Sequence, residues 1–144
     1  MAEIIVLDSG PLGRLTHPAR NPEIVTWLEH LLDAGVSVVI PEIVDYEVRR
    51  SFLLEGLTRS LARLDELGEA LAFQPLNTAA MRHAAELWAE ARRRGQPTAD
   101  PKELDGDVIL AAQAWQLGAT VATENVGHLA QFVPALQWQE ITAD

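Results

Sequence analysis

Short aliphatic stretches alternate with helical patterns along this chain, and that alternation constrains its fold more than any other feature. The stretches expected to be buried strands are 3–7, 36–40, 70–76, 119–122 and 136–141. Helical patterns lie between them, over 23–34, from 41 onward, and over 58–69, 78–94 and 105–117. This order predicts an α/β fold in which helices cover both faces of a parallel sheet. No internal repeat or linker interrupts the pattern, so residues 1–144 are expected to form one domain.

The composition excludes several classes of protein. The 144 residues include no cysteine, which excludes a disulfide framework and thiolate chemistry. No apolar run approaches the roughly 20 residues of a membrane span. The first residues are too few and too acidic for a signal peptide. We therefore expect a cytoplasmic protein with no membrane segment.

The charge is strongly negative, which limits how the chain can bind nucleic acid. The formal net charge is −10, and Lys102 is the single lysine among 11 basic residues. Non-specific affinity for nucleic acid comes mostly from neutralising phosphates, so such a chain binds it poorly. Two arrangements would change this. The acids can gather around a divalent cation, and the arginines, which bind phosphate as a planar fork, can gather elsewhere.

Two carboxylates, Asp105 and Asp107, stand just before an apolar helical run. Asp105 fits the N-cap and Asp107 the first turn, where a carboxylate meets free N–H groups and the positive end of the helix dipole. Capping explains one of these acids well. The helix that follows is apolar on nearly every side, so it is expected to pack inside the domain and to bring its first residues to the border of the sheet.

Further polar side chains follow the expected strands. Asp8 comes directly after the first strand and Asn125 follows the fourth, so both are expected at the edge where the carboxyl ends of parallel strands meet. Residues 8–13 are expected to be a turn and 14–22 a loop. Glu47 lies on or beside the apolar stripe of its helix, about two turns in, where solvation explains an acid poorly. Asp105 and Asp107 begin the helix that leads into the fourth strand, and their convergence with the others depends on the preceding loop.

If these groups converge, they form a site of oxygen ligands. Three or four carboxylates and one amide suit Mg²⁺ or Mn²⁺, which retain several waters. Such an ion can activate water and stabilise the charge that develops on a phosphodiester. His128 is the one imidazole placed to take part, as a ligand, as a proton shuttle or only as a residue at the start of a helix.

Four segments resemble, in order and spacing, the motifs of PIN-domain nucleases. They are residues 7–12 (LDSGPL), 45–50 (DYEVRR), 105–112 (DGDVILAA) and 123–126 (TENV). Each segment is weakly specific alone, and the four together cover nearly the whole chain. The chain is most similar to single-domain bacterial proteins of the type found as toxins in VapBC toxin–antitoxin pairs.

The resemblance implies a three-layer α/β/α domain with an acidic pocket. Members of this family are mostly Mg²⁺- or Mn²⁺-dependent endoribonucleases and are commonly dimers. By motif, Asp8, Glu47 and Asp107 would bind the metal, and Asp105 would be a supporting acid. Asn125 would be a further ligand, but it stands where many members have Asp, which lowers the charge of the site.

Three alternatives differ from this interpretation. A phosphoacceptor receiver domain needs a lysine after its last strands, and Lys102 is in the wrong place. A haloacid-type phosphatase needs a second Asp two residues after its nucleophile, whereas Asp8 is followed by Ser9 and Gly10. The third, a PIN-fold module that binds RNA or protein with little or no nuclease activity, remains open.

The partners expected are single-stranded RNA, an antitoxin protein and a second copy of the chain. Arg14, Arg49 and Arg92 to Arg94 would guide phosphates to the acidic site. Four tryptophans in a chain with few aromatic residues suggest that a partner covers apolar area, through helices in the 43–70 region or the helix that carries Trp88.

Overall fold

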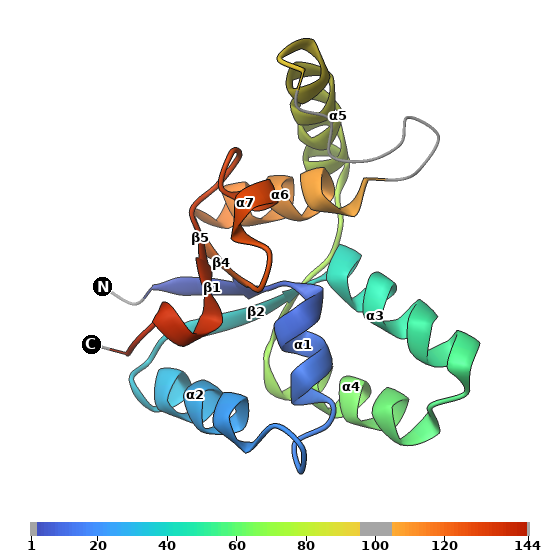
Figure 1. The fold of residues 1–144 in the computed structure, drawn as a ribbon, viewed down its shortest axis with the longest axis vertical. Coiled ribbons are helices and arrows are strands. Elements are labelled where there is room, and N and C mark those ends of the chain that lie inside the picture. Colours follow the sequence, from blue (N-terminus) through green and yellow to red (C-terminus); the bar gives the residue numbers. More distant parts are fainter. Residues whose placement is uncertain (1–2, 96–104, 144) are drawn as a thin grey trace.

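A parallel sheet lies at the centre of the computed structural model, which describes residues 3–95 and 105–143 (Figure 1). Its five strands are β1 (Ile4–Leu7), β2 (Ser37–Pro41), β3 (Ala72–Gln74), β4 (Thr120–Thr123) and β5 (Ala135–Gln137). They are hydrogen-bonded in the order β3-β2-β1-β4-β5, and every neighbouring pair is parallel. The predicted parallel sheet is confirmed, with strand boundaries that differ by a few residues.

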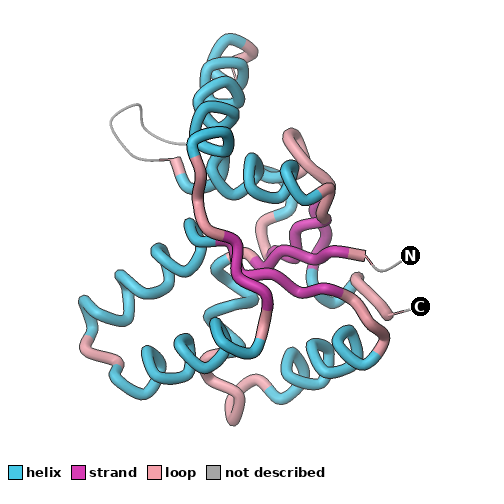
Figure 2. Tube along the Cα trace, turned by 180° about the vertical axis from the view of Figure 1, so that it is seen from behind, coloured by secondary structure: helices cyan, strands magenta, loops and turns pink. Residues whose placement is uncertain are grey.

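Helices cover both faces of the sheet. They are α1 (Ser9–Leu15), α2 (Pro22–Asp33), α3 (Glu42–Glu55), α4 (Thr58–Ala70), α5 (Thr78–Arg93), α6 (Gly106–Leu117), α7 (Val126–Leu129) and the 3₁₀ helix η1 (Trp138–Glu140). Helices α5, α6 and α7 lie on one side of the sheet, and α1, α2 and α4 lie on the other (Figures 1 and 2). The architecture is therefore the three-layer α/β/α arrangement that was expected.

The middle strand and α6 form the centre of the core. Ile5, Val6 and Leu7 of β1 are buried, as expected for a strand with neighbours on both edges and helices on both faces. In α6, all seven residues 108–114 are buried, which explains why this helix is apolar on every side. Its first residues are therefore carried to the edge of the sheet by a core element.

The strand order reverses at the centre of the sheet. From β1 the chain adds β2 and β3 on one side and later adds β4 and β5 on the other. The connections that follow β1 and β4 therefore lead away in opposite directions. Open α/β sheets bind ligands at this point, beyond the carboxyl ends of the two strands. Asp8 follows β1 and Thr123 ends β4, so both lie at this switch point.

The predicted turn and loop after β1 are wrong over residues 9–15, because these residues form α1. Asp8 caps this helix by accepting a hydrogen bond from the Ser9 amide at 2.7 Å. Pro11, Leu12 and Leu15 bury its inner side, so capping and packing outweigh the low helix propensity of two glycines and a proline. Gly10 also has a packing role, since a side chain there would meet the Glu124 carboxylate.

Other boundaries also differ from the sequence prediction. The expected strand 70–76 is shortened to β3, and the last strand ends at Gln137, where η1 begins. The predicted loop 95–102 falls outside the described residues except for Gly95. Within the described ranges, no helix combines the length and apolar character needed to cross a membrane.

Candidate active site

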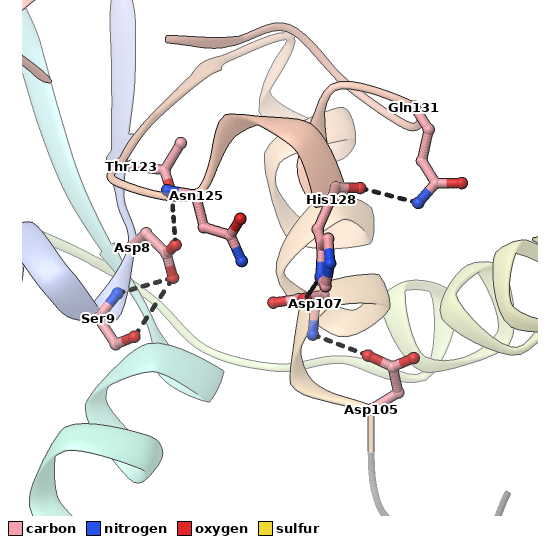
Figure 3. Close-up of polar contacts among 8 residues, drawn as sticks. All are labelled: Asp8, Ser9, Asp105, Asp107, Thr123, Asn125, His128 and Gln131. Atoms are coloured by element: carbon pink, nitrogen blue, oxygen red, sulfur yellow. Dashed lines mark hydrogen bonds and ion pairs between the residues drawn. The ribbon is translucent and has the colours of Figure 1, made fainter. Parts of the chain in front are cut away.

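Asp8 is held at the switch point by bonds to both of its carboxylate oxygens. Oδ1 accepts from the Ser9 amide at 2.7 Å, and Oδ2 accepts from the Thr123 hydroxyl, also at 2.7 Å. Thr123 is fully buried at the end of β4, and its oxygen accepts from the Asn125 amide at 2.9 Å. Thr123 belongs to the segment 123–126 but had no predicted role, although a hydroxyl at the last position of a buried strand is a usable signal. Asp8 is thereby fixed to the central pair of strands (Figure 3).

Asp105 and Asp107 lie at the start of α6. Asp105 is buried and is the N-cap, as predicted, because its Oδ1 accepts from the Asp107 amide at 3.1 Å. Its Oδ2 is buried without a hydrogen-bond partner in the described residues. Asp107 Oδ2 stands 3.4 Å from Nδ1 of His128, which α7 presents from beyond β4 (Figure 3). Because α6 ends just before β4 begins, its first turn lies at the carboxyl edge of the sheet, on the side of Asp8.

Glu47 approaches this cluster from α3. A Cβ at Gly106 would overlap the Glu47 carboxylate, so the missing side chain at the first residue of α6 leaves room for it. Burial raises the pKa of Glu47 to about 7, and the charges of Asp8, Asp107 and Asp105 contribute, while Arg50 lowers it. Burial and the charge of Asp8 also raise the pKa of Asp107, and His128 opposes this. The four acids therefore carry negative charge that neighbouring cations compensate only in part.

Gln113 ties the two helices that carry Glu47 and Asp107. Its side chain is fully buried, its Oε1 accepts from the Ile43 amide at 3.3 Å, and its Nε2 donates to the Gln74 carbonyl at 3.0 Å. The Ile43 amide belongs to the first turn of α3, where no side chain of the N-cap makes a hydrogen bond. Gln113 thus replaces the missing cap from across the core and fixes α3 against α6.

Glu42 also joins α3 to the end of β3, because its Oε1 accepts from the Leu76 amide at 2.7 Å. The carboxylate of Glu42 therefore binds the backbone beyond β3 and is not free in solvent.

The sequence model of the PIN domain matches residues 5–130. The chain belongs to the PIN-domain family. That match spans the four motifs whose acids or amide meet at the carboxyl edge of the sheet. No curated protein sequence matches the chain.

Solved structures show the same fold. A chain of VapBC2 from Rickettsia felis, bound to a DNA fragment from their promoter, has a TM-score of 0.76 and 18% identity, with 92% of this chain and 97% of that chain covered. FitAcB from Neisseria gonorrhoeae has a TM-score of 0.71 and 21% identity, with 95% and 99% covered. DNA-bound VapBC from Salmonella typhimurium has a TM-score of 0.67 and 22% identity, with 96% and 99% covered.

PIN domains typically use divalent metal ions, and the donors of this PIN domain suit such an ion. The site offers carboxylate oxygens, an excess of negative charge, and a buried Asp105 oxygen without a partner in the described residues. In the described ranges, no three His, Asp or Glu side chains are grouped closely enough to hold one ion as they stand. The fit is therefore to an ion such as Mg²⁺, which binds one or two carboxylates directly and keeps several waters.

The arginines of this PIN domain are distributed differently from the expectation. Arg14 is held by the Glu124 carboxylate at 2.6 Å, and Arg49 by Asp45 at 3.1 Å and Asp65 at 2.8 Å. These ion pairs occupy the two guanidinium groups that were expected to guide phosphates. Arg92 to Arg94 lie at the far end of α5, which extends away from the sheet (Figure 1).

Proposed function

We propose that this PIN domain is a divalent-metal-dependent endoribonuclease that hydrolyses phosphodiester bonds in single-stranded RNA, with Mg²⁺ or Mn²⁺ as cofactor. One observation carries the proposal. Four acids from three separate segments lie at the switch point of the sheet, where burial first and the neighbouring carboxylates second raise the pKa of Glu47 to about 7. Such an arrangement is costly for folding and matches what a bound cation would neutralise. Membership of a family whose members are generally nucleases supports the same activity.

The residues would divide the work as follows. Asp8 and Asp107 would hold the ion, with Glu47 and Asn125 as further ligands or as partners of its water molecules. When bound, the ion would activate water and stabilise the charge developing on the phosphate. Thr123 keeps Asp8 oriented through its hydroxyl, and Asp105 keeps the first turn of α6 in place through its bond to the Asp107 amide. His128 can hold a proton at Nδ1 beside Asp107.

We propose further that the protein is the toxin of a toxin–antitoxin pair and acts in the cytoplasm. The structures with the same fold are of VapBC and FitAB complexes, several of them bound to DNA, which supports an antitoxin protein as partner. A homodimer is proposed from exposed apolar side chains on α3, which lies in the 43–70 region, and on α6. Leu53 and Leu54 of α3 are 62% and 88% exposed, and Trp115 is 64% exposed on α6, beside α5. Light scattering at micromolar concentration tests the dimer, and a monomer there would contradict it.

Cleavage assays with purified protein test the nuclease. We expect cleavage of single-stranded RNA with Mg²⁺ or Mn²⁺ and none in excess EDTA. Asp107→Asn should abolish cleavage without loss of fold, because removing a charge relieves repulsion within the cluster. Asp8→Asn should do the same, with a folding control by circular dichroism since Asp8 also caps α1. Cleavage that persists in EDTA, or that survives Asp8→Asn unchanged, would refute the metal-dependent mechanism.

A second candidate function is RNA or protein binding with little or no cleavage. Asn125 favours it, because an amide adds no negative charge at the position after β4. In the described residues, no three His, Asp or Glu side chains are grouped closely enough to hold one metal ion, which also favours this alternative. Absence of cleavage of every RNA tested with Mn²⁺, together with measurable binding, would establish this alternative.

A further inference from the structure

A groove next to the acidic cluster separates α1 from α3. Its volume is about 350 Å³, and its lining includes Ser9 and Gly13 from α1 and Glu47, Arg50, Ser51 and Phe52 from α3. Ser9 directly follows Asp8, and Glu47 is itself one of the clustered acids. The groove therefore shares Glu47 with the proposed metal site and lies beside Asp8.

Arg50 places a cation in this groove. It is exposed, its guanidinium lies 5.2 Å from the centre of the Tyr46 ring, and it makes no ion pair within residues 3–95 and 105–143. Its charge acts on Glu47, since Arg50 lowers the pKa of that carboxyl group. Arg49 is the adjacent residue, yet Asp45 and Asp65 neutralise it. Arg50 is thus available to an anion that approaches the acids.

Tyr46 adds an exposed aromatic surface beside that cation. Its side chain is 49% exposed, and it precedes Glu47 in the same helix. Proteins bind single-stranded nucleic acids with aromatic rings, on which bases stack, and with cationic groups, which bind the phosphates. Tyr46 and Arg50 provide one of each. A base inside a duplex is already stacked on its neighbours, so it cannot use such a surface without unstacking.

We propose that Arg50 and Tyr46 form a subsite for single-stranded RNA, in which Arg50 binds a backbone phosphate next to the scissile one and Tyr46 stacks on a base. This inference rests on the proposed nuclease function and deepens it. It explains how an acidic protein holds an anionic substrate, because a cation beside the cluster attracts the backbone that the acids repel. It also explains a preference for single strands, because stacking on Tyr46 requires an unpaired base.

The test uses the full chain carrying Asp107→Asn, so that bound RNA stays intact. Fluorescence anisotropy measures the Kd of labelled single-stranded oligouridylate in the presence of Mg²⁺ over a series of salt concentrations. Arg50→Ala should weaken binding roughly tenfold and reduce the slope of log Kd against log salt by about 0.7, the value for one lost phosphate contact with a single strand. Arg50→Lys should retain the slope, because the charge remains.

Variants of Tyr46 separate stacking from charge. Tyr46→Ala should weaken binding about tenfold with the salt slope unchanged, and Tyr46→Phe should bind nearly as the starting protein does. The matched control is Arg59→Ala, which removes the same charge from an exposed position of α4. Its Kd should change far less than that of Arg50→Ala.

Two results would overturn the subsite. One is equal binding by Arg50→Ala and Arg59→Ala, and the other is failure of the starting protein to bind oligouridylate at low salt. The nuclease proposal is judged separately by cleavage with the unmodified chain. Cleavage with Arg50-independent binding would refute the subsite alone. Arg50-dependent binding without cleavage by the unmodified chain would support the subsite and refute the nuclease.

Discussion

Replacing Glu47 by Gln should stabilise the metal-free protein at alkaline pH and leave its stability nearly unchanged at acid pH. The Glu47 carboxyl has a pKa of about 7 in the folded chain, against 4.5 for an ordinary glutamate. Below about pH 4.5 it is neutral in both the folded and the unfolded chain. Between 4.5 and 7 only the folded chain keeps the proton. Above 7 the folded chain must hold the charge among three other acids, so the free energy of unfolding falls as pH rises through this window.

The size of the effect follows from the pKa difference. A tenfold change in acidity constant corresponds to 1.36 kcal/mol, so the difference between 4.5 and about 7 sets an upper limit of about 3.4 kcal/mol. Glu47 is partly exposed, and solvent screening reduces that limit, so we expect about half of it. For a chain of this length the melting temperature should rise by about 5 °C. Within the described residues the Glu47 carboxylate accepts no hydrogen bond, and the bond from the Ser51 hydroxyl goes to its backbone carbonyl, so glutamine loses none of them.

Thermal or urea unfolding in EDTA at pH 4.5, 6 and 8 measures the difference between the Gln variant and the wild-type protein. Asp107 titrates in the same cluster, so the curve describes the coupled group of acids as well as Glu47. Glu55→Gln at the exposed end of α3 is the matched control and should show no such dependence. Added Mn²⁺ should stabilise the wild type more than the Gln variant, because it binds the charged folded form. The reasoning would be refuted if the Gln variant were stabilised equally at pH 4.5 and pH 8, or if it were less stable than the wild type at pH 8 in EDTA.

Three further substitutions test how the site is built. Gln113→Leu should lower the free energy of unfolding by about 1–3 kcal/mol in urea titrations, because the Ile43 amide and the Gln74 carbonyl lose a buried partner; a cost equal to that of Gln116→Leu, on the same helix but partly exposed, would contradict this. Gly106→Ala should displace the Glu47 carboxylate and reduce RNA cleavage while circular dichroism shows an intact fold, since that flexible side chain can move; unchanged cleavage would count against a role for this contact. Asn125→Asp should bind Mn²⁺ more tightly by calorimetry, and equal affinity would exclude position 125 from the metal site.

The fold could be predicted further from the sequence than the site could. The order of strands and helices follows from periodic patterns of apolar residues within short stretches of the sequence. These patterns correctly predicted the parallel sheet and the buried helix after Asp105. The failure at α1 has a physical reason. Its residues have poor helix propensity, and its stability comes from the Asp8 cap and from packing of Leu12 and Leu15, neither of which a local pattern records.

Side-chain partners that are distant in sequence account for what the prediction of the site missed. Arg49 and Arg50 are adjacent and chemically alike, but Asp45 on the same helix and Asp65 on α4 neutralise Arg49 alone, and the contact with Asp65 cannot be read from a local pattern. Gln113 did carry a signal, as the one polar residue in the buried run 108–114, but its target on α3 lies 70 residues away. The roles of Asp8, Glu47, Asp105, Asp107 and Asn125 in metal binding stay predictions.

The structure also shows how the domain can tolerate a cluster of acids. Glu47 on α3 is repelled first by Asp8, which follows β1, and then by Asp107 on α6. Both helices are anchored in the core, since residues 108–114 of α6 are buried and Gln113 bonds to the first turn of α3. Moving the helices apart would break those buried contacts, so the repulsion persists and adds to burial, the larger cause, in raising the pKa of Glu47 and of Asp107. A cation that binds among these acids would relieve the repulsion that is present in the folded chain. This relief would increase the affinity of the site for the cation without a change in backbone structure.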